Sequence, residues 1–213
     1  APMSVTGFAG GYLSDIGAKT IFGDGQLSVL AGMFAPMGKV SPVEGGYRAG
    51  GRYSFGSGSG HADWIGGGAK AVDADGPYDL IYLVPKEKAE LKGNWHVLGL
   101  AGSGSYDYEI PEQFVSSELV LRRAGGTPVR GQASQLLGLQ VMGSAGHAGV
   151  AMGLARRALQ ELHGVLSAGK VRPGAIPVME QQLFLHEFSS QEAKLSSARA
   201  FVIEAFAEAL ATA

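Results

Sequence analysis

The sequence predicts an α+β fold in which an antiparallel β-barrel or sandwich precedes a long antiparallel helical hairpin. Two observations support this prediction. Short β-like runs separated by turn residues fill positions 26–125, and apolar residues at helical spacing fill positions 126–213. Strands and helices that occur in separate blocks, without alternating, argue against a Rossmann or TIM-barrel architecture. We therefore expect a middle β domain over 26–125 and part of a C-terminal helical domain over 126–213.

Positions 1–25 are expected to form the end of an N-terminal helical domain. The stretch from Tyr12 to Phe22 has the pattern of a helix end and is followed by Gly23 and Gly25. Glycine is common just after the last helical residue because it adopts the left-handed conformation without steric cost. This segment is too short to pack alone.

The β-like runs of the middle domain are bounded by glycine and proline. Such boundaries, together with alternating burial, are typical of strands in antiparallel sheets. The predicted strands and turns are an apolar run over Leu27–Phe34 ending at Pro36, a Gly45-Gly46 turn before Tyr47, a strand at 79–84 between Pro77 and Pro85, an alternating run at 106–110, and a last run over Phe114–Leu121.

Two long apolar stripes predict the helices of the last region. The first runs from Leu137 to Leu166 and the second from Phe184 to Ala209, with glycines and prolines between them at 169–177. At about 30 residues each, these helices would be ~45 Å long. Two helices form a hairpin and not a closed bundle, so we expect an incomplete bundle that is covered by missing segments or in a homo-oligomer, a dimer or tetramer.

Composition excludes several classes of protein. The chain has no cysteine, which excludes a disulfide scaffold, a cysteine nucleophile and a thiolate metal site. The formal net charge is −2 without blocks of like charge, so no nucleic-acid or anionic-membrane surface is expected. The five histidines lack metal-ligand spacing, so we expect no metal site. No leader-like segment or membrane-length apolar run is present, and we expect a cytoplasmic protein.

Glycine and serine alternate at 56–60 and again at 102–105. A phosphate-binding loop needs a following helix N-terminus, or a Gly-Lys-Ser/Thr sequence, to present its amides to the phosphate. Neither run has that context. Tight turns or bulges are therefore the favoured interpretation of these glycines.

Two longer blocks resemble the central β domain of the acyl-CoA dehydrogenase superfamily. The first contains GGYR at 45–48, GRYSFGSG at 51–58 and HADW at 61–64, and the second contains WHVLGL at 95–100 and GSGSYDY at 102–108. Within that superfamily they look most like the flavin-dependent monooxygenases, such as the two-component aromatic hydroxylases. One departure is Ala101, which stands where the superfamily usually has arginine.

This resemblance implies a bound flavin, FMN or FAD, and assigns roles to individual residues. The Ser57 hydroxyl would donate to flavin N5, and Phe55 would pack on the isoalloxazine ring, with Gly56 between them. Further cofactor-binding residues would be Met33 and Phe34 on the preceding strand and Arg172 at the cofactor phosphate. The implied substrate-side residues are Ser103, Ser105 and His61. No counterpart of the superfamily's catalytic residue is identified.

Three functions follow from the resemblance. The first is a two-component monooxygenase, in which a partner flavin reductase supplies reduced flavin and O2 is used on a small organic substrate. The second is an acyl-CoA dehydrogenase that transfers a hydride to flavin, and the third is a truncated, non-catalytic oligomeric scaffold. Asp63 and Asp107 lie in the matching blocks. Either they act as acid or base, or they bond backbone amides of nearby turns.

Overall fold

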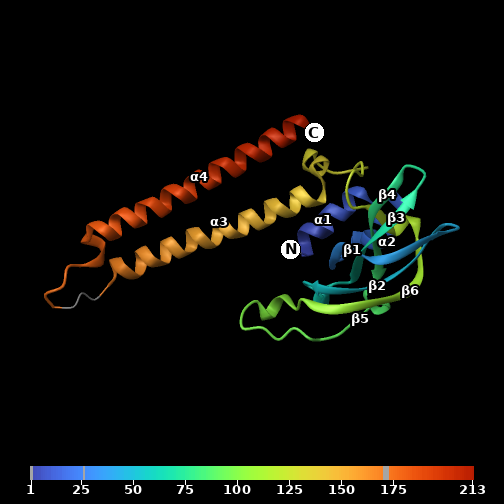
Figure 1. The fold of residues 1–213 in the computed structure, drawn as a ribbon, viewed down its shortest axis with the longest axis horizontal. Coiled ribbons are helices and arrows are strands. Elements are labelled where there is room, and N and C mark those ends of the chain that lie inside the picture. The colour runs from blue at the N-terminus through green and yellow to red at the C-terminus, as the bar shows by residue number, and fades with distance from the viewer. Residues whose placement is uncertain (1, 26, 170–172) are drawn as a thin grey trace. The chain divides into compact units, whose positions relative to one another are not determined.

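The computed structural model describes residues 2–25, 27–169 and 173–213, shown as a ribbon in Figure 1. Within these ranges the fold is α+β, with four α-helices and one mixed sheet of seven strands. Contacts divide the chain into a compact unit up to Gly143 and a second unit from Ser144 to Ala213. The elements are α1 (Pro2–Tyr12), α2 (Asp15–Phe22), β1 (Leu30–Val43), β2 (Gly46–Gly56), β3 (Trp64–Asp73), β4 (Gly76–Pro85), β5 (Glu90–Leu91), β6 (Tyr106–Ser116), β7 (Val120–Arg122), α3 (Gly138–Ser167) and α4 (Gln182–Thr212).

The strand order in the sheet is β5-β6-β2-β1-β3-β4-β7. All neighbouring strands are antiparallel except β1 and β3, which pair in parallel from Leu30↔Trp64 onward. The predicted antiparallel arrangement therefore holds for five of the six strand pairs and fails for the pair of β1 and β3. The parallel pair arises because β1 and β2 form a hairpin, and the chain then returns on the far side of β1. The sequence does not reveal the parallel pairing, because the residues of a strand do not indicate the direction of the strand beside it.

Burial on both faces of the sheet creates two apolar clusters. In β4, Leu80 and Tyr82 face one cluster, whereas Ile81 and Leu83 face the other, as expected when successive side chains point to opposite faces. The second cluster packs against α1 and α2 through residues such as Leu13, which is fully buried. The two N-terminal helices therefore cover one face of the sheet.

The N-terminal helical segment differs from the prediction of one helix end over Tyr12–Phe22. The structure has two helices with a break between them, and Ser14 caps the second by accepting a hydrogen bond from the Gly17 N–H at 3.1 Å. Arg130 then donates to the carbonyl oxygens of Gly10 and Leu13, both at 2.6 Å. These bonds satisfy carbonyls at the end of α1 that would otherwise lack partners.

Strand limits also differ from the prediction. The strand predicted to end at Pro36 continues to Val43, because the β1–β3 pairing shifts register on each side of Pro36. Such irregularities tolerate a residue without an N–H. The strand β3 is not among the predicted strands. The strand at 79–84 is present within β4, and the alternating run at 106–110 within β6.

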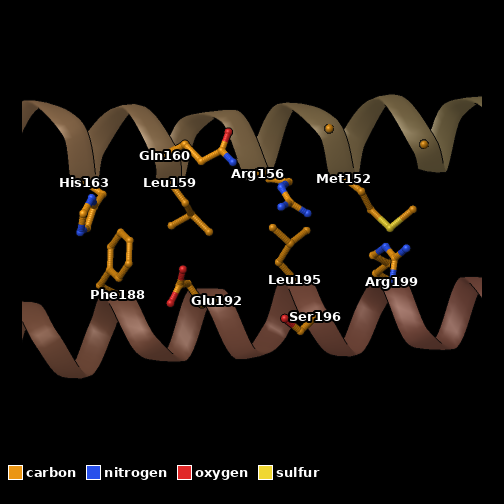
Figure 2. A pocket seen from close by; sticks show the side chains of 12 residues that line it. Met152, Arg156, Leu159, Gln160, His163, Phe188, Glu192, Leu195, Ser196 and Arg199 are labelled. Atoms are coloured by element: carbon orange, nitrogen blue, oxygen red, sulfur yellow. The ribbon is translucent and has the colours of Figure 1, made fainter.

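The second unit contains most of α3 and all of α4, the two long helices that the stripes predict. At one end of the groove between the helices, the ring of His163 on α3 lies 6.2 Å from the ring of Phe188 on α4, measured between centroids. At the other end, Met152 of α3 lies opposite Arg199 of α4 (Figure 2). Residue numbers therefore fall along one helix as they rise along the other, so the helices are antiparallel. Among the residues described, neither helix has a buried side chain. Also among the described residues, no helix combines the length and apolar character needed to span a membrane.

Candidate functional site

A β-bulge at the end of β2 positions the predicted cofactor-binding residues. Tyr53 pairs with Tyr108 and Gly56 with Tyr106, so Ser54 and Phe55 together lie opposite Asp107. This arrangement of two residues against one defines a bulge, which bends the strand and redirects its side chains. Phe55 and Ser57, although two residues apart, therefore do not lie on one regular strand face as they would in an undisturbed strand.

Phe55 lies in the left-handed region with φ of 62°. A bulky side chain rarely adopts this conformation, which costs on the order of 1 kcal/mol and occurs where the surrounding structure imposes it. The Phe55 side chain is also 62% exposed, and its ring contacts Trp95 edge-on at 6.4 Å between centroids. The bulge thus presents an aromatic ring at the surface, where flat apolar ligands could stack.

At Gly56 the backbone passes directly against a buried aromatic ring. A Cβ atom there would lie 2.8 Å from the ring of Tyr108, closer than such atoms approach in folded proteins. The Ser57 N–H then donates to the Phe55 carbonyl at 2.8 Å, which closes a tight turn around Gly56. The glycine therefore allows Phe55 and Ser57 to emerge at the surface directly above the core.

Three serine hydroxyls form a continuous hydrogen-bonded chain beside this turn. Ser57 Oγ lies 2.6 Å from Ser105 Oγ, which lies 3.1 Å from Ser103 Oγ, and Ser103 Oγ donates to the Leu100 carbonyl at 2.7 Å. Ser57 is exposed, Ser103 is half-buried and Ser105 is buried. The structure therefore brings together predicted cofactor-side and substrate-side residues. We call this group the hydroxyl chain.

The segment 92–105 is fixed to the sheet by reciprocal hydrogen bonds. Asn94 Nδ2 donates to Asp107 Oδ2 at 2.8 Å, and the Asp107 N–H donates to Asn94 Oδ1 at 2.9 Å. The Asn94 side chain, followed by Ser54 and the backbone of Phe55, lowers the pKa of the Asp107 carboxyl. Asp107 thus holds both the segment and the bulge, in agreement with the backbone-bonding alternative. Asp63 has a similar role, since its Oδ2 accepts from the Val29 N–H at 2.8 Å.

Met33 and Phe34 do not share a face. Met33 packs against the cluster that contains Tyr53 and Tyr108, whereas Phe34 packs against the cluster beneath α1. Both side chains are partly buried. A ligand on the Met33 side of the strand would therefore not contact the Phe34 ring directly.

Buried tyrosines connect Met33 to the bulge. The Met33 N–H donates to the Tyr108 hydroxyl, which in turn donates to the Gly66 carbonyl, both at 2.6 Å. The Tyr53 and Tyr108 rings stack at 5.1 Å, and the Tyr53 and Tyr82 hydroxyls are 2.9 Å apart. Burial raises the pKa of Tyr53 to about 12 and raises those of Tyr82 and Tyr108 as well. All three are therefore neutral and hydrogen-bonded near neutral pH.

The remaining predicted residues lie elsewhere. His61 is exposed in the turn that follows the bulge, and its backbone N–H donates to the Gly58 carbonyl at 3.0 Å. Arg172 lies outside the described residues. Within the described ranges, no three His, Asp, Glu or Cys side chains converge to hold a metal ion.

Sequence reasoning does not select Trp95 and Asn94 as site residues, although both lie in the second matching block or beside it. The Trp95 Nε1–H donates to the Leu100 carbonyl at 3.1 Å, which is the same oxygen that ends the hydroxyl chain. The sequence signal that could have selected Trp95 is its position shortly before the glycine and serine residues at 102–105. This signal is weak, because only the bulge in β2 brings the Phe55 ring against Trp95.

The second unit has an open groove of about 770 Å³ between its helices. Figure 2 shows Arg156 and Arg199 projecting into it from opposite helices, among Met152, Leu159 and Leu195. The arginines are exposed. The groove has the character of an uncovered helix–helix surface, in contrast to the fixed hydrogen-bonding geometry of the hydroxyl chain.

Comparison with known proteins is consistent with the resemblance to flavoenzymes. No family model matches the chain. It is 30% identical over 207 residues to an indole-3-acetate monooxygenase of Pseudomonas putida, covering 93% of this chain and 52% of that protein. It is 32% identical over 98 residues to the oxygenase subunit HsaA of a flavin-dependent monooxygenase of Mycobacterium tuberculosis, covering 46% of this chain and 25% of that subunit. Both relatives are monooxygenases.

A solved structure shows the same fold. XiaF from Streptomyces sp., in complex with FADH2 and glycerol, superposes with a TM-score of 0.74 at 22% identity, over 96% of this chain and 55% of that one. The resemblance to the acyl-CoA dehydrogenase superfamily fits these relatives. The chain spans about half the length of the indole-3-acetate monooxygenase.

Proposed function

We propose that this chain supplies the flavin-binding β domain and part of the helical domain of a two-component flavin monooxygenase. The observation that carries the proposal is the strained, exposed Phe55 held beside the hydroxyl chain. A flavin needs a flat apolar surface together with a few hydrogen-bonding groups at its ring edge. Phe55, with Trp95 at its edge, provides the surface, and Ser57 provides the group.

In this proposal the chain binds and orients the cofactor, FMN or FAD, and excludes water from one face of its ring. Reduced flavin, when bound, would supply the electrons that activate O2. Ser57 contacts N5, Met33 lies on the cofactor side, and Ser103, Ser105 and His61 face a small organic substrate. The roles of Phe34 and Arg172 stay predictions. A separate flavin reductase would deliver the reduced cofactor.

The helical region is proposed to belong to an incomplete bundle in a homo-oligomer. The support is that α3 and α4 have no buried side chain among those described, although apolar residues such as Leu154 and Phe201 are 67% and 71% exposed. Exposed apolar surface of this extent normally contacts other protein. The division into regions 1–25, 26–125 and 126–213 belongs to the same proposal.

A flavin titration tests the cofactor site. FMN and FAD are added to the purified chain, and ring fluorescence is followed for the natural chain and for Phe55→Ala and Ser57→Ala. Phe114→Ala is a matched control, since Phe114 is 55% exposed on β6 and lies outside the site. We expect saturable binding that weakens at least about tenfold in Phe55→Ala, the loss of roughly 1.4 kcal/mol of stacking, and stays unchanged in the control.

Activity assays then separate the functions. Oxygen consumption that depends on a flavin reductase and on a substrate, with indole-3-acetate as the first compound tested, supports a monooxygenase. Bleaching of bound flavin by an acyl-CoA without NADH would instead identify a dehydrogenase. A folded chain that binds neither FMN nor FAD would refute the proposal and favour the scaffold.

A further inference from the structure

When every contact in the hydroxyl chain carries a hydrogen bond, its protons have a single arrangement. Each serine hydroxyl has one hydrogen to donate and two lone pairs that accept. The Leu100 carbonyl can only accept, so the Ser103 proton points to it across 2.7 Å. In the 3.1 Å link between Ser103 and Ser105, Ser105 must then be the donor.

The same reasoning fixes the outer link. Because the single proton of Ser105 is directed to Ser103, the 2.6 Å bond between Ser57 and Ser105 must use the Ser57 proton. All donors therefore point inward, from exposed Ser57 through buried Ser105 to half-buried Ser103. At the surface, Ser57 presents lone pairs and no proton.

Resting on the proposed flavin site, we propose that this inward polarity makes the site discriminate between the two redox states of the flavin. In the reduced ring N5 carries a hydrogen, which the Ser57 lone pairs can accept without any change in the chain. In the oxidised ring N5 is only an acceptor. To donate to N5, the Ser57 hydroxyl must break its hydrogen bond to Ser105. The Ser105 hydroxyl then donates to Ser57 and no longer donates to Ser103. Ser103 and Ser105 are thus positioning residues that favour the reduced cofactor.

The magnitude follows from the bond that is lost. Reversing the chain exchanges the bond between Ser57 and Ser105 for one of opposite direction and leaves the link between Ser105 and Ser103 without a proton. One neutral hydrogen bond corresponds to about fivefold in an equilibrium constant. The ratio of the oxidised-flavin Kd to the reduced-flavin Kd should therefore be about fivefold larger than in a chain without this constraint.

Two substitutions remove the constraint by different routes. In Ser103→Ala the Ser105 proton loses its inner acceptor and turns to Ser57, which frees the Ser57 proton for a ligand. In Ser105→Ala the Ser57 proton has no inward acceptor. Both should lower the Kd ratio about fivefold, and the double variant should lower it no further. Ser103→Thr keeps a hydroxyl and should retain the natural Kd ratio. Ser41→Ala should retain it too, because Ser41 is an exposed residue of β1 that does not belong to the hydroxyl chain.

The experiment titrates the full chain with FMN, either oxidised or reduced with dithionite under anaerobic conditions. The potential of bound FMN gives an independent readout, and a fivefold fall in the ratio corresponds to a decrease of about 20 mV for this two-electron couple. If the substitutions weaken both redox states equally, the polarity inference is wrong while the flavin site stands. If the folded natural chain binds neither state, both proposals are overturned.

Discussion

Replacing Phe55 by glycine and by alanine separates the strain at this position from the ligand contact made by its ring. Both substitutions remove the edge-on contact between Phe55 and Trp95. Losing such an aromatic pair lowers stability by about 0.5–1.5 kcal/mol in either variant. The variants differ in the backbone, because φ at this position is 62°. Alanine keeps the steric penalty of the left-handed conformation, about 1–2 kcal/mol, and glycine removes it.

The glycine variant should be the more stable of the two. Glycine gains from the relieved strain but loses about 0.5–1 kcal/mol through the greater freedom of the unfolded chain. The difference between the two effects spans about 0–1.5 kcal/mol, and its midpoint predicts that Phe55→Gly unfolds with a free energy about 0.7 kcal/mol higher than Phe55→Ala. Urea unfolding followed by far-UV circular dichroism measures this difference, provided that the two variants have equal m-values.

Phe114 provides the matched comparison. It is a similarly exposed phenylalanine in β6, paired with Arg48 of β2, and its φ is not among the positive values of the described residues. In a regular strand glycine is less stable than alanine by about 0.5–1 kcal/mol. The order of the two variants should therefore reverse at this position. The same order at both positions would refute the strained bulge, and natural flavin affinity in Phe55→Gly would exclude its ring from the site.

Three further outcomes are expected from the residues around the bulge. Tyr108→Phe leaves the Met33 N–H and the Gly66 carbonyl without their hydroxyl partner. The unfolding free energy should fall by about 2–4 kcal/mol, whereas Tyr106→Phe should change it by about 0.5 kcal/mol or less; equal urea midpoints would contradict this. Burial raises the pKa of Tyr53 to about 12. The buried neutral hydroxyl of Tyr53 therefore contributes fully to stability below the pKa of tyrosine in the unfolded chain, and this contribution is lost as the pH rises toward the pKa of Tyr53 in the folded chain. The loss should be about 1.4 kcal/mol per pH unit between those two values, measured as the difference in unfolding free energy between the natural chain and Tyr53→Phe; a difference independent of pH would refute it. Asn94→Ala removes both bonds to Asp107. It should weaken flavin binding by about fivefold while changing tryptophan emission, and unchanged affinity would show that the segment is held by other contacts.

The helices could be predicted from the sequence because their evidence is local. Apolar residues recur at helical spacing over the whole length of α3 and α4, as one face of a packed helix requires. The intervening glycines and prolines exclude a continuous helix. The strand at 79–84 is also marked by its own residues, an apolar run between Pro77 and Pro85. In both cases the pattern that indicates the element lies within the element or directly beside it.

The strand β3 could not be predicted, because successive glycines from Gly66 to Gly68 suggest a turn. In the structure they are required by close neighbours. A Cβ on Gly66 would lie 2.5 Å from the Phe34 ring, and one on Gly67 would lie 2.6 Å from the Tyr53 hydroxyl. These neighbours come from other strands, so the sequence around the glycines does not indicate them. The parallel direction of β3 is hidden from the sequence for the same reason.

The candidate site could be predicted only in part. The resemblance selects Phe55, Ser57, Ser103 and Ser105, and the structure places these residues around one turn. Nothing in the local sequence indicates the positive φ of Phe55, because residues in that conformation are usually glycine. It depends on Asp107, distant in the chain, which faces the bulge across the β2–β6 pair.

Asp107 explains why the strained bulge persists. The same carboxylate accepts from Asn94 of the preceding segment and bonds to Ser54 and to the Phe55 backbone. The strain of a left-handed residue is comparable with the contribution of one or two hydrogen bonds, so these contacts are sufficient to offset it. The bulge, the segment 92–105 and the hydroxyl chain therefore depend on one another. A ligand that stacks on Phe55 meets a surface whose shape and hydrogen-bond direction are set before binding, which reduces the entropy lost on association.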